Sequence, residues 1–201
     1  MIRLHQRAMP DHSIKSETLE ALKWLAFFFM AIDHLYRFTP LTQLEFMLPL
    51  GRLAMPLFAF TFGYSLTNFT FKNAQSVRML LFRLLITALI SSIPYIYLQS
   101  PSNAFGIWPL NIIFTFFLAA LILYINTWKK IYSIFIAAAL FIIGGMVVEY
   151  FWAGLLLTIS SYYFAKRPNW KNILLIVFSL TLLIDLNGNF YALLFLPIVY
   201  F

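Results

Sequence analysis

Residues 22–34 read LKWLAFFFMAIDH, an apolar run that ends in an acid and an imidazole. The run belongs to a longer hydrophobic stretch, 19–38, which is close to the ~20 residues that a helix needs to cross a bilayer. Hydrophobic residues make up 62% of the 201 positions and charged residues only 10%, whereas a soluble domain carries about a quarter charged residues. The sequence therefore predicts a membrane protein built of helices.

The order of hydrophobic stretches predicts an all-α, polytopic transmembrane helix bundle with about eight spans. We expect the spans at about 19–38, 49–69, 78–98, 107–126, 131–147, 149–165, 170–186 and 189–201. The later stretches are near or below the ~17 residues that set the lower limit, so seven spans with a half-embedded end is the alternative. Residues 1–18 are expected to be a basic cytosolic tail, and 19–201 a single transmembrane bundle.

The basic residues indicate an orientation. Of the 14 Lys and Arg residues, all but Arg37 and Arg52 fall in the tail, in every second loop, or within a turn of them. The positive-inside rule then places both termini in the cytoplasm, across a bacterial-type inner membrane. This pattern also accounts for the net charge of +7, so binding to nucleic acid is not expected.

Ionisable and polar residues collect at the opposite, non-cytoplasmic level. Asp33 and His34 lie below the membrane surface, where such side chains are costly and usually mark a functional site. Arg37 follows one helical turn after Asp33, and Arg52 begins the second span. Other polar residues at this level are Glu45, Asn111, Glu149, Asp185, Asn187 and Asn189. The pattern predicts one site formed by several spans.

Structural explanations compete for some of these residues. Asp33 and Arg37 could form a structural ion pair, Arg52 could reach lipid phosphates, and acids near an interface need no special role. His34 is the hardest to explain in this way. With 3 His and no Cys, a metal site is not expected, and cysteine chemistry is excluded.

Two motifs resemble those of a known family. Residues 22–34 resemble the opening helix of the TraX family, with the pattern LK…AL…M..DH. Residues 51–60, GRLAMPLFAF, resemble its second signature, GR.AFPLFAF. Weaker matches are 110–115 to N..FT, 150–156 to YG..GLL, and 192–197 to ALL.LP. The resemblance covers nearly the whole chain, from about 19 to 201.

The resemblance implies a membrane acetyltransferase of the conjugal-transfer type, which acetylates the N-terminal amine of pilin with acetyl-CoA. Many relatives carry an acid a few residues after FAF, where this chain reads TFGY at 61–64. The acceptor is therefore open: the pilin N-terminus, an exported glycan, or a lipid-linked molecule.

Acyl transfer needs a base for the acceptor's proton and positive charge for the developing oxyanion. His34, Asp33 and Arg52 are the expected catalytic residues, with His34 as the base because imidazole exchanges protons near neutral pH. Arg52, Arg37 and Asn111 are expected to bind acetyl-CoA, whose pantetheine arm would reach the outer half from the cytosol.

Two other functions fit a buried Asp, His and Arg. One is a proton- or ion-coupled transporter, although the DH and GR motifs do not recur in the second half as an inverted repeat would require. The other is a non-enzymatic accessory protein, in which the polar cluster only holds helices together.

Overall fold

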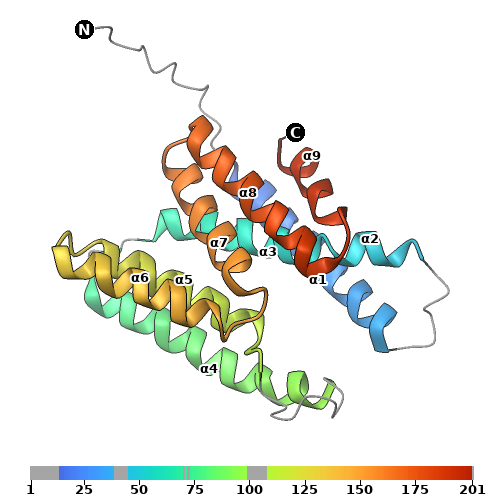
Figure 1. Ribbon diagram of the computed structural model, residues 1–201, viewed down its shortest axis with the longest axis horizontal. Helices are drawn as coiled ribbons and strands as arrows, with labels where there is room; N and C mark the ends of the chain where they lie inside the picture. The colour runs from blue at the N-terminus through green and yellow to red at the C-terminus, as the bar shows by residue number, and fades with distance from the viewer. Residues whose placement is uncertain (1–13, 39–44, 70, 72, 99–107, 201) are drawn as a thin grey trace, which may run out of the picture.

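The computed structural model describes residues 14–38, 45–69, 71, 73–98 and 108–200, and its described part is all-α apart from one isolated bridge between Leu110 and Val148 (Figure 1). The all-α part of the predicted fold class is confirmed. The helices are α1 Ser16–Phe38, α2 Met47–Gly51, α3 Ala54–Ser65, α4 Ala74–Leu98, α5 Ile112–Asn126, α6 Ile131–Gly145, α7 Phe151–Lys166, α8 Trp170–Asn187 and α9 Phe195–Tyr200, with the 3₁₀ segments η2 Leu66–Asn68 and η3 Tyr191–Leu194. The predicted cytosolic tail lies mostly outside the described residues.

The predicted second span, 49–69, is not one helix. It is divided into α2, a turn at Arg52 and Leu53, α3, and η2. Proline lacks the backbone N–H that an uninterrupted helix would need, but it is tolerated in a first turn, where no partner exists. Pro56 falls in the first turn of α3, which explains why the helix begins again just before it.

The predicted last span, 189–201, consists of η3 followed by the six-residue α9. Two helices, α4 and α8, are long and apolar enough to cross a membrane among the residues described. The apolar α5 and α6 have 15 residues each, a rise of about 23 Å against a hydrocarbon core of ~30 Å. The number of spans and the side of the termini stay predictions.

The helices form two groups that meet along α7 (Figure 1). The helices α4, α5 and α6 pack side by side as one layer. The second group contains α1, α3 and α8, and α7 contacts α3 and α8 on one side and α5 and α6 on the other. The central helix is α3, which is buried along most of its length.

The α3–α7 contact depends on small residues. A Cβ atom at Gly63 would collide with the backbone oxygen of Thr158 and would lie 3.0 Å from Cβ of Ser161. The hydroxyls of Thr158 and Ser161 donate to carbonyls of their own helix, at 2.9 and 2.6 Å. Glycine has no side chain, and these small hydroxyl residues bond within their own helix, so the two backbones can approach closely, as in many membrane helix pairs.

The first helix, α1, has a buried stripe that repeats every three or four residues: Leu19, Leu22, Ala26, Phe29 and Asp33. This spacing keeps one face of a helix against its neighbours. The other face exposes large apolar side chains, such as Trp24 at 66% and Phe28 at 61%, as expected for a surface in contact with lipid. Asp33 is thus placed in the interior by the same periodicity that buries the leucines.

Gly63→Ala is expected to separate α3 from α7 and to lower the free energy of unfolding by about 1–3 kcal/mol, because the added methyl group meets backbone that cannot rotate away. The measurement is the melting temperature of the purified protein in detergent. Ala138→Val on the exposed face of α6 is the control, and it should change the melting temperature little. A Gly63→Ala protein as stable as the wild type would contradict this packing.

Candidate functional site

A cavity of about 370 Å³ lies where α1, α3, α4, the start of α5 and the segment before α7 meet, and we call it the Asp33 cavity. Its volume is in the range of small-molecule sites, ~300–1,000 Å³. Its walls are mainly apolar, and the polar side chains that line it are Asp33, His34, Ser91, Tyr95, Asn111, Glu149 and Tyr150. Four residues that the sequence placed at one level, Asp33, His34, Asn111 and Glu149, therefore line one cavity.

His34 lies near the end of α1, one turn after Met30. Its Nδ1 is 2.8 Å from the carbonyl oxygen of Met30. A carbonyl oxygen can only accept, so Nδ1 carries the proton and donates it. In the neutral ring the lone pair is then on Nε2, the nitrogen that can act as a base. The contact with the helix backbone thus favours the tautomer whose basic nitrogen is Nε2.

Asp33 is 8% exposed and packs against the backbone of Gly51. A Cβ atom at position 51 would lie 2.7 Å from both Cβ and Oδ1 of Asp33, closer than real Cβ atoms approach. Residue 51 must therefore be glycine if the carboxyl group is to keep this position. The acid of the first motif and the glycine of the second are in direct contact.

Asn111 connects the start of α5 to α4. Its side-chain oxygen accepts from the backbone N–H of Ile113 at 3.1 Å and so caps α5. Its amide nitrogen donates to the carbonyl oxygen of Ala88 at 2.8 Å and to Oγ of Ser92 at 3.0 Å. Both amide protons are thus used in holding the two helices together. The expected contact of Asn111 with acetyl-CoA stays a prediction, and it would require one of these bonds to be exchanged.

The segment that enters α7 is held in an unusual backbone conformation. Leu110 donates to the carbonyl of Val147 and accepts from the N–H of Glu149, both at 2.7 Å. Tyr150 and Phe151 then have φ angles of 60° and 47°, in the left-handed region that costs most residues on the order of 1–3 kcal/mol. The backbone bends at the point where Glu149 and Tyr150 meet the cavity.

The expected basic residues are less closely tied to the cavity. Arg52 lies in the break between α2 and α3 and is half-buried, and it does not line the Asp33 cavity. Its Nε is buried and has no hydrogen-bond partner among the described residues. Arg37 is near the end of α1, but its side chain lies outside what the structure describes. The roles of both arginines in catalysis and acetyl-CoA binding stay predictions.

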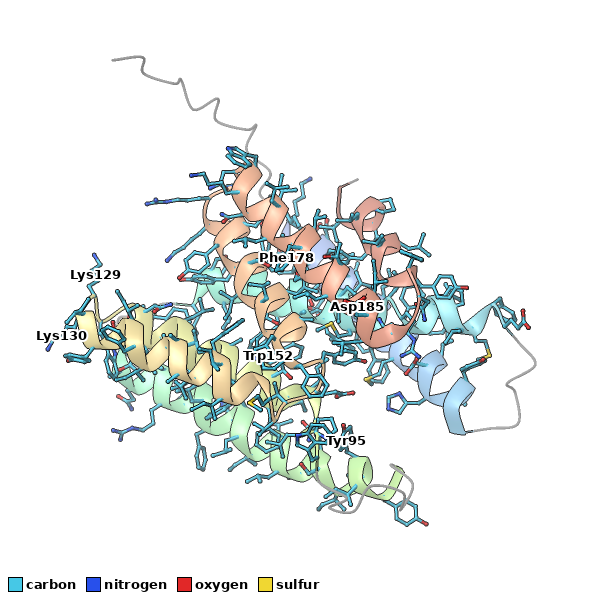
Figure 2. All side chains as sticks on the ribbon, in the orientation of Figure 1. Tyr95, Lys129, Lys130, Trp152, Phe178 and Asp185 are labelled. Atoms are coloured by element: carbon cyan, nitrogen blue, oxygen red, sulfur yellow. The ribbon has the colours of Figure 1, made fainter. Side chains whose placement is uncertain are left out.

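Other polar residues of the predicted site lie apart from the cavity walls. Glu45 and Asp185 are exposed and do not line the Asp33 cavity, and Figure 2 shows Asp185 towards the end of α8. Over the residues described, no group of three or more His, Cys, Asp or Glu side chains is placed to hold a metal ion.

Sequence reasoning missed three cavity residues: Ser91, Tyr95 and Tyr150. The first two belong to a polar interruption, SSIPY at 91–95, in the apolar helix α4. That interruption was a usable signal, because serine and tyrosine hydroxyls in a membrane helix generally face a protein interior. For Tyr150, the sequence signal was its position in the weak match of residues 150–156 to the family pattern.

The sequence profile described as TraX protein matches residues 18–201. The chain belongs to the TraX family. No curated protein and no solved structure matches the chain significantly. TraX membership and the two long apolar helices indicate a membrane protein related to pilin acetylation.

Asn111→Ala is expected to lower the free energy of unfolding by about 1–3 kcal/mol, because it removes the cap of α5 and both hydrogen bonds that join the start of α5 to α4. Thermal unfolding in detergent measures the change. Asn126→Ala, at the exposed opposite end of α5, serves as the matched control. Equal stability of the two variants would show that Asn111 does not hold α4 to α5.

Proposed function

We propose that this TraX protein is an integral membrane acetyltransferase of the inner membrane, and that it moves an acetyl group from cytosolic acetyl-CoA to an acceptor on the outer side. The observation that carries the proposal is the state of His34. Its Nδ1 lies 2.8 Å from the carbonyl oxygen of Met30, so in the neutral ring the basic lone pair is on Nε2, and the residue lines the Asp33 cavity. Membership of a family linked to pilin acetylation supports the same chemistry.

The reaction is nucleophilic acyl transfer. The acceptor's amine or hydroxyl attacks the thioester carbonyl, a new N–C or O–C bond forms, and the C–S bond breaks. Nε2 of His34 takes the acceptor's proton as the bond forms and returns a proton to the departing CoA thiolate. The imidazole ends the cycle neutral, and no further reactant is required.

The neighbouring groups have complementary roles in this proposal. Asp33 is fixed against Gly51 and provides negative charge in the same cavity while the imidazole of His34 carries the acceptor's proton. Arg52 provides positive charge near the second motif for the thioester oxygen, and its unpaired Nε supports such a use. We assign to Glu149, on a strained segment of the cavity wall, a hydrogen bond from the neutral amine of the acceptor.

The proposal has two candidate classes of acceptor. The pilin N-terminus is the first candidate, and an exported glycan or lipid-linked molecule the second. In the segment where many relatives carry an acid, Thr61 is buried and its hydroxyl donates to the carbonyl of Leu57 at 2.8 Å, while Gly63 packs against α7. No acid of this chain replaces that group within the segment 61–64.

His34→Ala is expected to reduce acetyl transfer about a hundredfold or more, because general base catalysis contributes that much. The melting temperature should change little, since the ring is exposed. The assay is release of CoA thiol from acetyl-CoA by purified protein in detergent, with a short amine-bearing pilin N-terminal peptide as acceptor. Leu35→Ala, the exposed neighbour, is the matched control.

Full activity in His34→Ala would rule out this mechanism. A loss of activity that only follows a fall in melting temperature would favour a scaffold. A wild-type protein that is well folded yet neither binds nor turns over acetyl-CoA would favour the transporter.

A further inference from the structure

A second cavity, of about 690 Å³, lies at the opposite end of α5 and α7 from the Asp33 cavity. It is formed by the end of α5 with the turn that follows it, the segment around η2, and the last turns of α7. We call it the Lys129 cavity. Figure 2 shows Lys129 and Lys130 at one end of the layer of α4, α5 and α6 and Tyr95, a residue of the Asp33 cavity, towards the other.

The lining of the Lys129 cavity combines aromatic rings with positive charge. Two lysines, Lys129 and Lys166, are part of the wall, and none of its lining residues is acidic. The aromatic side chains of the wall are Phe69, Phe71, Tyr124, Trp128, Tyr162 and Tyr163. Aromatic faces stack on planar bases, and lysine ammonium groups bind phosphate. The ligand that matches both features is a phosphorylated aromatic molecule, which is the chemistry of a nucleotide.

Both lysines are held in particular positions. Nζ of Lys166 donates to the hydroxyl of Tyr162 at 2.8 Å and lies 4.9 Å from the centre of that ring. Lys129 has φ of 53°, a left-handed conformation that glycine or asparagine adopts at lower cost. A lysine that serves only to orient the chain in the membrane needs neither arrangement.

The distance between the two cavities matches the length of the donor. Along α5, the nearest lining residues are Ile113 and Leu123, a rise of about 15 Å. Along α7 they are Tyr150 and Tyr162, about 18 Å apart by the same measure. The pantetheine arm of CoA has about 13 chain atoms between its diphosphate and its sulfur, as many as four to five residues of extended backbone, or roughly 16 Å.

We infer that the Lys129 cavity binds the nucleotide portion of the acyl donor, with its phosphates on Lys129 and Lys166 and its base among the aromatic rings. This inference rests on the proposed function for the identity of the donor. It assigns the thioester to the Asp33 cavity and the phosphates to the predicted cytosolic end, where acetyl-CoA is available. Anionic lipid headgroups share the phosphate chemistry, but they lack the base that the aromatic wall would stack upon.

The test is binding of adenosine 3′,5′-bisphosphate, which contains the base and phosphates but no thioester, to the full-length protein in nanodiscs of neutral lipid. Titration calorimetry gives the dissociation constant. The double variant Lys129→Ala/Lys166→Ala is expected to weaken binding about tenfold or more, and Lys129→Arg/Lys166→Arg to restore most of it. The matched control is Lys130→Ala/Lys171→Ala, which removes the same charge from residues outside the cavity wall.

Selective weakening by the cavity pair, with the control pair near wild type, would support the inference. Equal weakening by both pairs, or no binding at millimolar nucleotide, would overturn it. A second arm repeats the titration in nanodiscs of phosphatidylglycerol. If the lysines affect only lipid binding, and nucleotide binding is the same in every variant, the site is a headgroup site and the inference is wrong.

The same samples separate this inference from the proposed function. Acetyl transfer that depends on His34 but not on the two lysines would support the proposed acetyltransferase and would contradict nucleotide binding in the Lys129 cavity. Nucleotide binding that depends on the lysines, in a protein that transfers no acetyl group, would support the Lys129 cavity as a nucleotide site and would contradict the proposed acetyltransferase.

Discussion

The contact between Asp33 and the backbone of Gly51 is the constraint on which the rest of the site depends. A carboxyl group in the bundle interior is costly, so its surroundings must be fixed. The buried stripe of α1 brings Asp33 inward, and the absence of a side chain at Gly51 leaves room for it. The break after Gly51 then ends α2 and begins the buried α3, while His34, next along α1, is left at the cavity.

The other walls of the Asp33 cavity are held by polar contacts at helix ends. Asn111 joins the start of α5 to α4, and Thr115 donates to the carbonyl of Glu149 at 2.9 Å, which fixes the strained segment before α7. Each contact ties a wall of the cavity to a different pair of elements. The rest of the bundle needs only helices with apolar side chains at helical spacing, but each of these helix ends is positioned by its own hydrogen bonds. A site of this kind is sensitive to packing far from His34, because the walls come from both helix groups.

Part of this arrangement could be predicted from the sequence, and the reasons are physical. Apolar composition and helix length predict the all-α bundle, and the cost of burying ionisable groups identifies Asp33 and His34. The convergence of Asn111 and Glu149 follows from the alternation of chain direction, which brings every second helix end to one level. Ser91 and Tyr95 were missed because α4 was treated as a uniformly apolar helix, although its polar interruption SSIPY could have indicated the face that is turned to the protein interior. The positive-inside rule already explained Lys129 and Lys166, so nothing in the sequence indicated that both line one cavity.

The most direct test of the central claim is protection of His34 from diethylpyrocarbonate, which modifies the unprotonated nitrogen of imidazole. Mass spectrometry of the purified protein gives the modification of each histidine with and without acetyl-CoA, and His5 and His12 are the internal reference. If the donor's thioester lies at the Asp33 cavity, saturating acetyl-CoA slows modification of His34 severalfold and leaves His5 and His12 unchanged, and adenosine 3′,5′-bisphosphate alone protects His34 far less. Equal modification of His34 with and without bound acetyl-CoA would contradict the account.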